Sequence, residues 1–195
     1  MIVCTPIING TAMNKPKQQP STVYLERPDP TQDDVTHINI HHKGKSKLGR
    51  ELSHYNTAHF VHPWFGPFET IEGLWHYLKD GCRDDVFRNL NGHKSKQRYR
   101  MKNQQGTYQN KTIPNVAEVI LLANYAKIEQ NPSIRDALIA STLPFDQYFL
   151  QDGSKWPIRP RGSEWVVTLF EDLRKHFQDG TTPKQLDYKE LFENY

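Results

Sequence analysis

The chain has 195 residues and a formal net charge of +3, which fits one domain with a decorated terminus. Hydrophobic residues make up 36% and aromatic residues 11%, so we expect a small, aromatic-rich core surrounded by long polar loops. Two cysteines are too few for a disulfide framework, and no apolar run approaches the roughly 18 residues of a membrane span. The mildly basic balance permits a phosphate-bearing ligand or nucleic acid but requires neither.

Residues 1–48 are predicted to form an N-terminal arm that contains a strand candidate. Proline, glutamine, lysine and aspartate are frequent over residues 9–34, a composition typical of extended segments. Residues 35–41 alternate in polarity and are β-branched, which favours a strand. The first residues lack the basic and apolar regions of a signal peptide, so we expect a cytoplasmic protein with no membrane partner.

An aromatic segment and a helix are predicted next. Residues 54–68 are aromatic and interrupted by proline and glycine, which indicates a short strand or hairpin. Thr70 is a predicted N-cap for a helix through Lys79, and Gly81 is its predicted stop. Residues 84–90 are predicted to add another helical turn.

Residues 91–112 are polar and basic and end in a stretch of glutamine, glycine and asparagine, which predicts a mobile loop. The basic side chains between residues 94 and 102 have two open roles. They either form a solvated surface or contact nucleic acid, in which case binding would weaken with added salt.

The C-terminal half is predicted to be mainly helical. Pro114 suits the start of a helix, and apolar residues at helical spacing continue it to Asn131. Pro132 opens a second helix, and residues 145–150 favour a strand.

Gly162 precedes the last predicted core helix, and residues 178–195 are expected to form a C-terminal tail that is helical from Pro183. Because helices outnumber a few short strands, the predicted fold class is α+β, mainly α-helical, with a single main domain.

Glu72 and Lys79 are the side chains with the clearest chemical potential. They are seven residues apart, close to two turns, so both fall on one face of the predicted helix. An acid and an amine on one stripe, beside Trp75 and His76, can bind and cleave a ribosyl compound. A solvated ion pair is the alternative, since surface charges at helical spacing are common. His76 follows Glu72 by four residues, so it can orient the carboxylate.

Two blocks of sequence around these residues follow a known pattern. Residues 49–55 (GRELSHY) match an entry motif of glycine, a hydrophobic residue and Ser-Asn-Phe, with His54 in place of the asparagine. Residues 68–79 match a helix that carries an acid and a lysine at the spacing of Glu72 and Lys79.

A third block extends from Leu121 to Arg174. Residues 127–142 resemble a pattern Lys-Phe-x-Gln-Asn followed by spaced leucines and a threonine, and Trp156 and Gly162 match later positions. In the order and spacing of these three blocks, the chain resembles the NADAR family, also called YbiA-like.

The resemblance implies a YbiA-like domain over residues 49–177. Family members hydrolyse phosphoribosylated riboflavin intermediates or remove ADP-ribose from guanine in DNA. We therefore expect an N-glycosidase that acts on a ribosyl or ADP-ribosyl nucleobase conjugate, with single-stranded DNA as an open partner. No metal or cofactor is expected, because glycosidic hydrolysis needs only water. Pro157 and Glu164 depart from the family pattern, so a non-catalytic binder of ADP-ribose-like nucleotides is the alternative.

The resemblance also implies roles for single residues. Glu72 is the expected catalytic carboxylate, which stabilises oxocarbenium character or activates water. Lys79 is expected either to contact a phosphate or to attack C1′ as a Schiff base. Arg159 and Arg161 come just before the predicted helix start at Gly162. Guanidinium groups beside the free amides of a helix start can bind phosphate, and a solvated basic loop is the alternative. The expected substrate-binding residues are Ser53, His54, Trp75, His76, Trp156, Arg159, Arg161 and Gly162.

Overall fold

A computed structural model describes residues 28–151 and 156–181. The first 27 residues of the arm expected over residues 1–48, and the helix expected from Pro183, lie outside the described residues. In chain order the helices are α1 (Lys47–Leu52), α2 (Ile71–Lys79), α3 (Gly92–Gln104), α4 (Val116–Glu129), α5 (Pro132–Ala140) and α6 (Ser163–Asp179). Short 3-10 turns lie at η1 (Pro30–Gln32) and η2 (Asp85–Asn89).

The strands are short and pair in twos. They are β1 (Ile38–Asn39), β2 (Phe60–His62), β3 (Gly66–Phe68), β4 (Phe145–Asp146), β5 (Phe149–Leu150) and β6 (Pro157–Ile158). Strand β1 runs parallel to β4, while β2–β3 and β5–β6 are antiparallel pairs. The predicted α+β class, mainly α-helical with a few short strands, is confirmed for the described residues.

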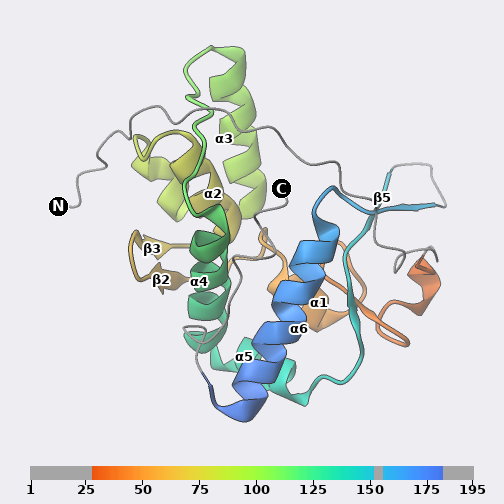
Figure 1. The fold of residues 1–195 in the computed structure, drawn as a ribbon. Helices are drawn as coiled ribbons and strands as arrows, with labels where there is room; N and C mark the ends of the chain where they lie inside the picture. The colour runs from red at the N-terminus through yellow and green to blue at the C-terminus, as the bar shows by residue number, and fades with distance from the viewer. Residues whose placement is uncertain (1–27, 152–155, 182–195) are drawn as a thin grey trace, which may run out of the picture.

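Helix α4 connects two groups of elements (Figure 1). It packs against α2 and β2 on one side and against α5 on another, and α2 in turn packs against α3. Helix α5 packs against α1 and α6. Because apolar residues lie around most of its circumference, α4 is buried along much of its length, as expected for a helix inside a domain.

Helix α2 begins and ends where the sequence predicts. The Thr70 side chain accepts a hydrogen bond from the N–H of Gly73 at 3.0 Å, which satisfies one of the free amides of the first turn. After Lys79 the chain reverses through Gly81, whose φ of +71° suits a residue without a Cβ.

The prediction of a mobile loop over residues 91–112 is wrong for its first part, which forms α3. The helix is capped by Asn91, which accepts from the N–H of Lys94 at 2.9 Å. Its basic side chains Arg98 and Lys102 pair with Asp84, which lies before η2. This helix has almost no apolar stripe, so hydrophobic periodicity could not reveal it.

Three other boundaries differ from the predictions. The strand expected over residues 35–41 is reduced to β1, and the one over residues 145–150 is divided into β4 and β5. Helix α4 starts at Val116, because Asn115 adopts a left-handed conformation with φ of 48° and interrupts the path from Pro114.

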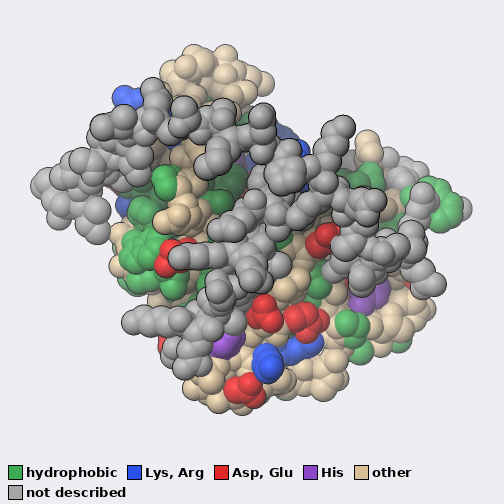
Figure 2. Space-filling view, in the orientation of Figure 1, with side chains coloured by type: hydrophobic (Ala, Val, Ile, Leu, Met, Phe, Trp, Pro, Cys, Tyr) green, Lys and Arg blue, Asp and Glu red, His purple; other side chains and the backbone are tan. Residues whose placement is uncertain are grey.

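Exposed apolar side chains gather over the β2–β3 hairpin, at the left of the face in Figure 2. They include Val61 and Trp64. Within the described ranges, no helix combines the length and apolar character needed to cross a membrane.

Candidate functional site

Glu72 and His76 lie together on α2. Nε2 of His76 is 3.1 Å from Oε1 of Glu72, as their spacing of one helical turn predicts. The Glu72 side chain is 12% exposed and that of His76 is 3% exposed, so the pair is largely shielded from solvent. The N–H of Glu72 donates to the carbonyl of His54 at 3.1 Å, which ties the first turn of α2 to the segment after α1.

The surroundings of Glu72 favour its ionised form. Burial alone would raise its pKa, but the hydrogen bond from His76 and the charges of His76, Lys96 and His54 together outweigh burial and lower the pKa. Nζ of Lys96, on α3, is 3.8 Å from Oε1 of Glu72. An ionised carboxylate can accept a proton from water or stabilise developing positive charge, so the site suits a base better than an acid.

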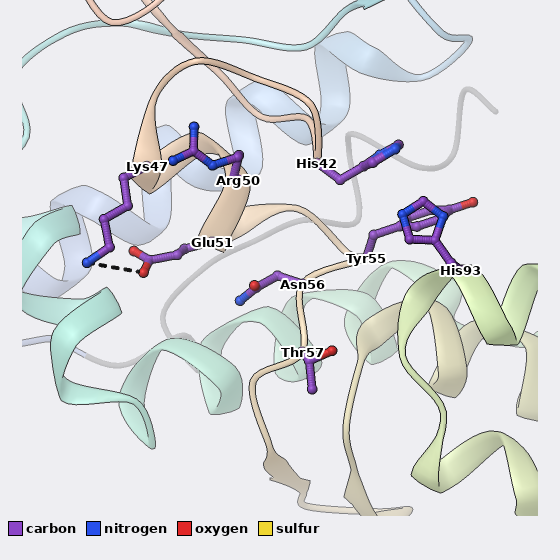
Figure 3. Close-up of a pocket in the computed structure, with 8 residues that line it drawn as sticks. All are labelled: His42, Lys47, Arg50, Glu51, Tyr55, Asn56, Thr57 and His93. Carbon is purple, nitrogen blue, oxygen red and sulfur yellow. Dashed lines mark ion pairs between the residues drawn. The ribbon is translucent and has the colours of Figure 1, made fainter.

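A pocket with a volume of about 380 Å³ lies between α1, the segment after it and the start of α3. Figure 3 shows aromatic rings on one side of the pocket and charged side chains on the other. Its lining residues are His42, Lys47, Arg50, Glu51, Tyr55, Asn56, Thr57 and His93.

The aromatic side of the pocket is a cluster of three rings. The rings of His42 and Tyr55 stack with centroids 4.8 Å apart, and His93 meets Tyr55 edge-on at 5.3 Å. Gly92 permits this approach, because a Cβ on that residue would lie 2.5 Å from Cα of Tyr55. The three rings come from different segments of the chain, since His42 follows β1, Tyr55 follows α1 and His93 lies in the first turn of α3.

Tyr55 connects the pocket to Glu72. Burial raises the pKa of Tyr55 to about 12, and the charge of Glu72 and a hydrogen bond with its side chain contribute in the same direction. Burial lowers the pKa of His42, and the charge of Glu72 acts in the opposite direction. The carboxylate thus lies against the wall of the pocket that these two rings form.

Ser53 and Lys127 are buried polar residues, and His54, next to Ser53 in sequence, is half-buried. Lys127 is 1% exposed, and its Nζ donates to the carbonyl of Ser53 at 2.9 Å. Burial lowers the pKa of Lys127 to about 7. His54 contacts the side-chain amide of Asn124 at 3.3 Å, and burial, followed by the charge of Lys127, lowers its pKa to about 4.

The side chain of Lys79 does not lie beside that of Glu72. It lies at the other end of α2, with its Nζ 5.9 Å from the centre of the Trp75 ring. Within the described residues, Glu72 forms ion pairs with His76 and Lys96 instead. Trp75, which was expected to bind substrate, is partly buried and packs against the hydrophobic core.

The residues expected near the last helix flank β6, with Trp156 directly before this strand and Arg159, Arg161 and Gly162 after it. Arg159 forms a two-point ion pair with Asp146, with its Nη2 2.7 Å from one carboxylate oxygen, so a phosphate there would compete with that pair. Trp156 is 64% exposed, and Arg161 is exposed as well. Gly162 is the N-cap of α6 with φ of +81°.

The pocket contains residues that sequence reasoning did not select, in particular His42, Lys47, Arg50 and His93. Tyr55 is the last residue of the first family-like block. Its place in that block was the only signal in the sequence for the ring cluster. Within the described ranges, no group of three or more His, Cys, Asp or Glu side chains is arranged to hold a metal ion. No protein-family model, curated protein or solved structure matches this chain.

Proposed function

We propose that this chain is an N-glycosidase of the NADAR kind, which hydrolyses the bond between ribose and a nucleobase in a ribosyl or ADP-ribosyl conjugate. The observation that carries the proposal is the position of Glu72. Its carboxylate is shielded, held in the ionised form and next to Tyr55, which lines a pocket together with other rings and charged side chains.

The convergence of the three family-like blocks supports the proposal. The N–H of Glu72 bonds to the His54 carbonyl, which joins the second block to the first. Nζ of Lys127 bonds to the Ser53 carbonyl, which joins the third block to the first. Segments that carry a shared function are expected to meet at one place in the fold, and these meet beside the pocket.

The reaction needs few groups from the protein. Water attacks C1′ as the C1′–N bond breaks, and the electron pair of that bond goes to the base nitrogen. The proton of the attacking water passes to Glu72, which also stabilises positive charge on the sugar. The base nitrogen takes up a proton from solvent, and Glu72 returns its proton to solvent. The rings of Tyr55 and His93 suit a planar base. Lys47 and Arg50 are the cations that can meet a phosphate, which would compete with Glu51 for Lys47 and with the Gly44 carbonyl for Arg50.

A substrate within DNA is supported by α3. Its N-terminal end supplies His93 to the pocket, and its side chains Lys94 and Arg100 are exposed. Exposed cations on a helix that also contributes to the pocket can bind a phosphate backbone.

The test is incubation of the protein with single-stranded DNA that carries ADP-ribosylated guanosine, with mass spectrometry of the released ADP-ribose. We expect release by the wild type and a loss of roughly 10²- to 10⁴-fold in Glu72→Gln, which keeps the shape of the side chain but cannot act as a base.

Glu69→Gln is the matched control for Glu72→Gln. Glu69 also accepts from a histidine, with Nδ1 of His59 at 3.2 Å, but it precedes α2 and its side chain is 34% exposed. Equal losses in both variants would contradict a specific role for Glu72, and absence of release by the wild type would contradict the activity on this substrate.

A non-catalytic binder of ADP-ribose-like nucleotides is the second candidate. The ion pairs of Glu72 with His76 and Lys96 favour it, because a carboxylate that is already paired can have a structural role. Tight binding of ADP-ribose without turnover, unchanged in Glu72→Gln, would support the binder over the enzyme.

A further inference from the structure

His76 has an oxygen partner at each ring nitrogen. Nε2 lies 3.1 Å from Oε1 of Glu72, and Nδ1 lies 2.9 Å from the hydroxyl of Tyr108. The imidazole is almost fully buried, so neither contact can be exchanged readily for water. The result is a linear chain of contacts from Tyr108 through His76 to Glu72.

This chain of contacts holds in either protonation state of the imidazole. A neutral ring donates from Nε2 to the ionised carboxylate and accepts at Nδ1 from the Tyr108 hydroxyl. A protonated ring donates from both nitrogens, and the same hydroxyl accepts. Rotation of the ring by half a turn would instead direct carbon atoms at both oxygens, so the two partners together specify one ring orientation.

Tyr108 is itself held in place. It lies just beyond α3, in a segment whose backbone is bonded to the end of α2. The N–H of Gln109 donates to Asp80 at 3.1 Å, and the N–H of Lys111 donates to the carbonyl of Lys79 at 2.8 Å. Burial raises the pKa of Tyr108, so its hydroxyl keeps its proton and remains both a donor and an acceptor.

We propose that Tyr108 is a positioning residue for Glu72 that acts through His76. It specifies the ring orientation in which Nε2 faces the carboxylate, and it thereby keeps Glu72 hydrogen-bonded at the pocket wall. The consequence for catalysis rests on the proposed function, since it assumes that Glu72 is the catalytic carboxylate. The ring orientation itself does not depend on that function.

Tyr99 supplies a matched control. Its ring stacks on His76 with centroids 4.6 Å apart and an interplanar angle of 13°, so it packs against the imidazole through its face. Tyr108→Phe and Tyr99→Phe each remove one hydroxyl from a ring next to His76, but only the first removes a hydrogen bond to it.

The experiment is long-range ¹H–¹⁵N NMR of the histidine rings in the wild type and both variants. We expect the Nδ1 resonance of His76 to show a hydrogen bond in the wild type and in Tyr99→Phe, and to lose it in Tyr108→Phe. A wild-type Nδ1 without a hydrogen bond, or the same spectrum in all three proteins, would overturn the proposal.

The release assay adds a second measurement. We expect Tyr108→Phe to lower kcat about 10-fold with KM unchanged, and Tyr99→Phe to leave both unchanged. If the wild type releases no ADP-ribose, the proposed function fails while the NMR result still decides whether Tyr108 orients His76. An altered NMR spectrum with unchanged kcat would refute the catalytic part alone.

Discussion

Three ionisable side chains lie close to one another: Glu72 on α2, Lys127 on α4 and His54 in the segment after α1. His54 is influenced by both of the others, because Lys127 lowers its pKa and Glu72 raises it, with burial the largest cause of the net lowering. Glu72 is stabilised as an anion and Lys127 is destabilised as a cation. A positive charge at Lys127 therefore has a free-energy cost, which the Ser53 carbonyl and the charge of Glu51 partly offset.

At the residue scale, this cost predicts how stability depends on pH. The pKa of Lys127 falls from its usual 10.5 to about 7, so between these values the unfolded chain binds more protons than the folded chain. Stability from this residue therefore rises with pH through this window, by at most about 1.4 kcal/mol per pH unit. Lys127→Met should lose that rise, which urea unfolding at pH 7, 8 and 9 can measure.

The control for this prediction is Lys94→Met, which changes an exposed lysine of α3 in the same way. Its unfolding free energy should follow the wild type at all three pH values. Parallel curves for wild type and Lys127→Met would mean that Lys127 keeps an ordinary pKa in the folded protein.

At the scale of the element, α3 depends on ion pairs more than on apolar packing. Burial opposes ionisation of Asp84, but hydrogen bonds and charges from Arg98 and Lys102 outweigh it, and its pKa is lowered. Asp80 also accepts from Lys102, so two acids that follow α2 hold the middle and the end of α3. Because α3 contributes His93 to the pocket, these pairs also maintain the site.

Asp84→Asn should therefore loosen α3 and lower the free energy of unfolding by about 1–3 kcal/mol, since it leaves two cations without their full partner. Faster amide hydrogen exchange over residues 92–104 would accompany this loss. Asp85→Asn is the matched control, because that acid is 80% exposed and pairs only at the surface with Arg88. Similar losses in the two variants would contradict the special role of Asp84.

At the scale of the whole molecule, the N-terminal and C-terminal parts of the described chain are joined by β1 and β4. Ile38 lies opposite Phe145 in this parallel pair, and both side chains are buried. Asn39 adds a side-chain bond to the N–H of Tyr148 at 3.0 Å. The turn that carries His42 directly follows β1, so the pairing also positions one ring of the pocket.

Asp33 stabilises this junction from within. Its carboxylate is almost fully buried and accepts from the N–H groups of Asn39 at 3.0 Å and Lys45 at 2.6 Å. Asp33→Ala leaves both amides without that acceptor, so we expect a loss of about 1–3 kcal/mol in urea unfolding. Asp136→Ala, at a 69% exposed aspartate on α5, should change stability by less than about 0.5 kcal/mol. Comparable losses would show that the buried acceptor is unimportant.

The sequence by itself determined the elements whose signals are local. The Thr70 cap, the Gly81 stop and the pairing of Glu72 with His76 depend on atoms within about one helical turn, so spacing and residue type suffice to predict them. The same holds for the break between α4 and α5 at Pro132 and for the start of α6 after Gly162.

Tertiary structure alone decided α3 and the composition of the pocket. Helix α3 has no apolar period, and its partners Asp80 and Asp84 lie outside it, so its stability comes from contacts that a local pattern does not contain. His42, Tyr55 and His93 meet only after β1, α1 and α3 have packed, and Tyr108 reaches His76 across 32 positions of sequence. Contacts of this kind depend on how elements pack in space, because the free energy that forms them comes from burial and long-range pairing rather than from neighbouring residues.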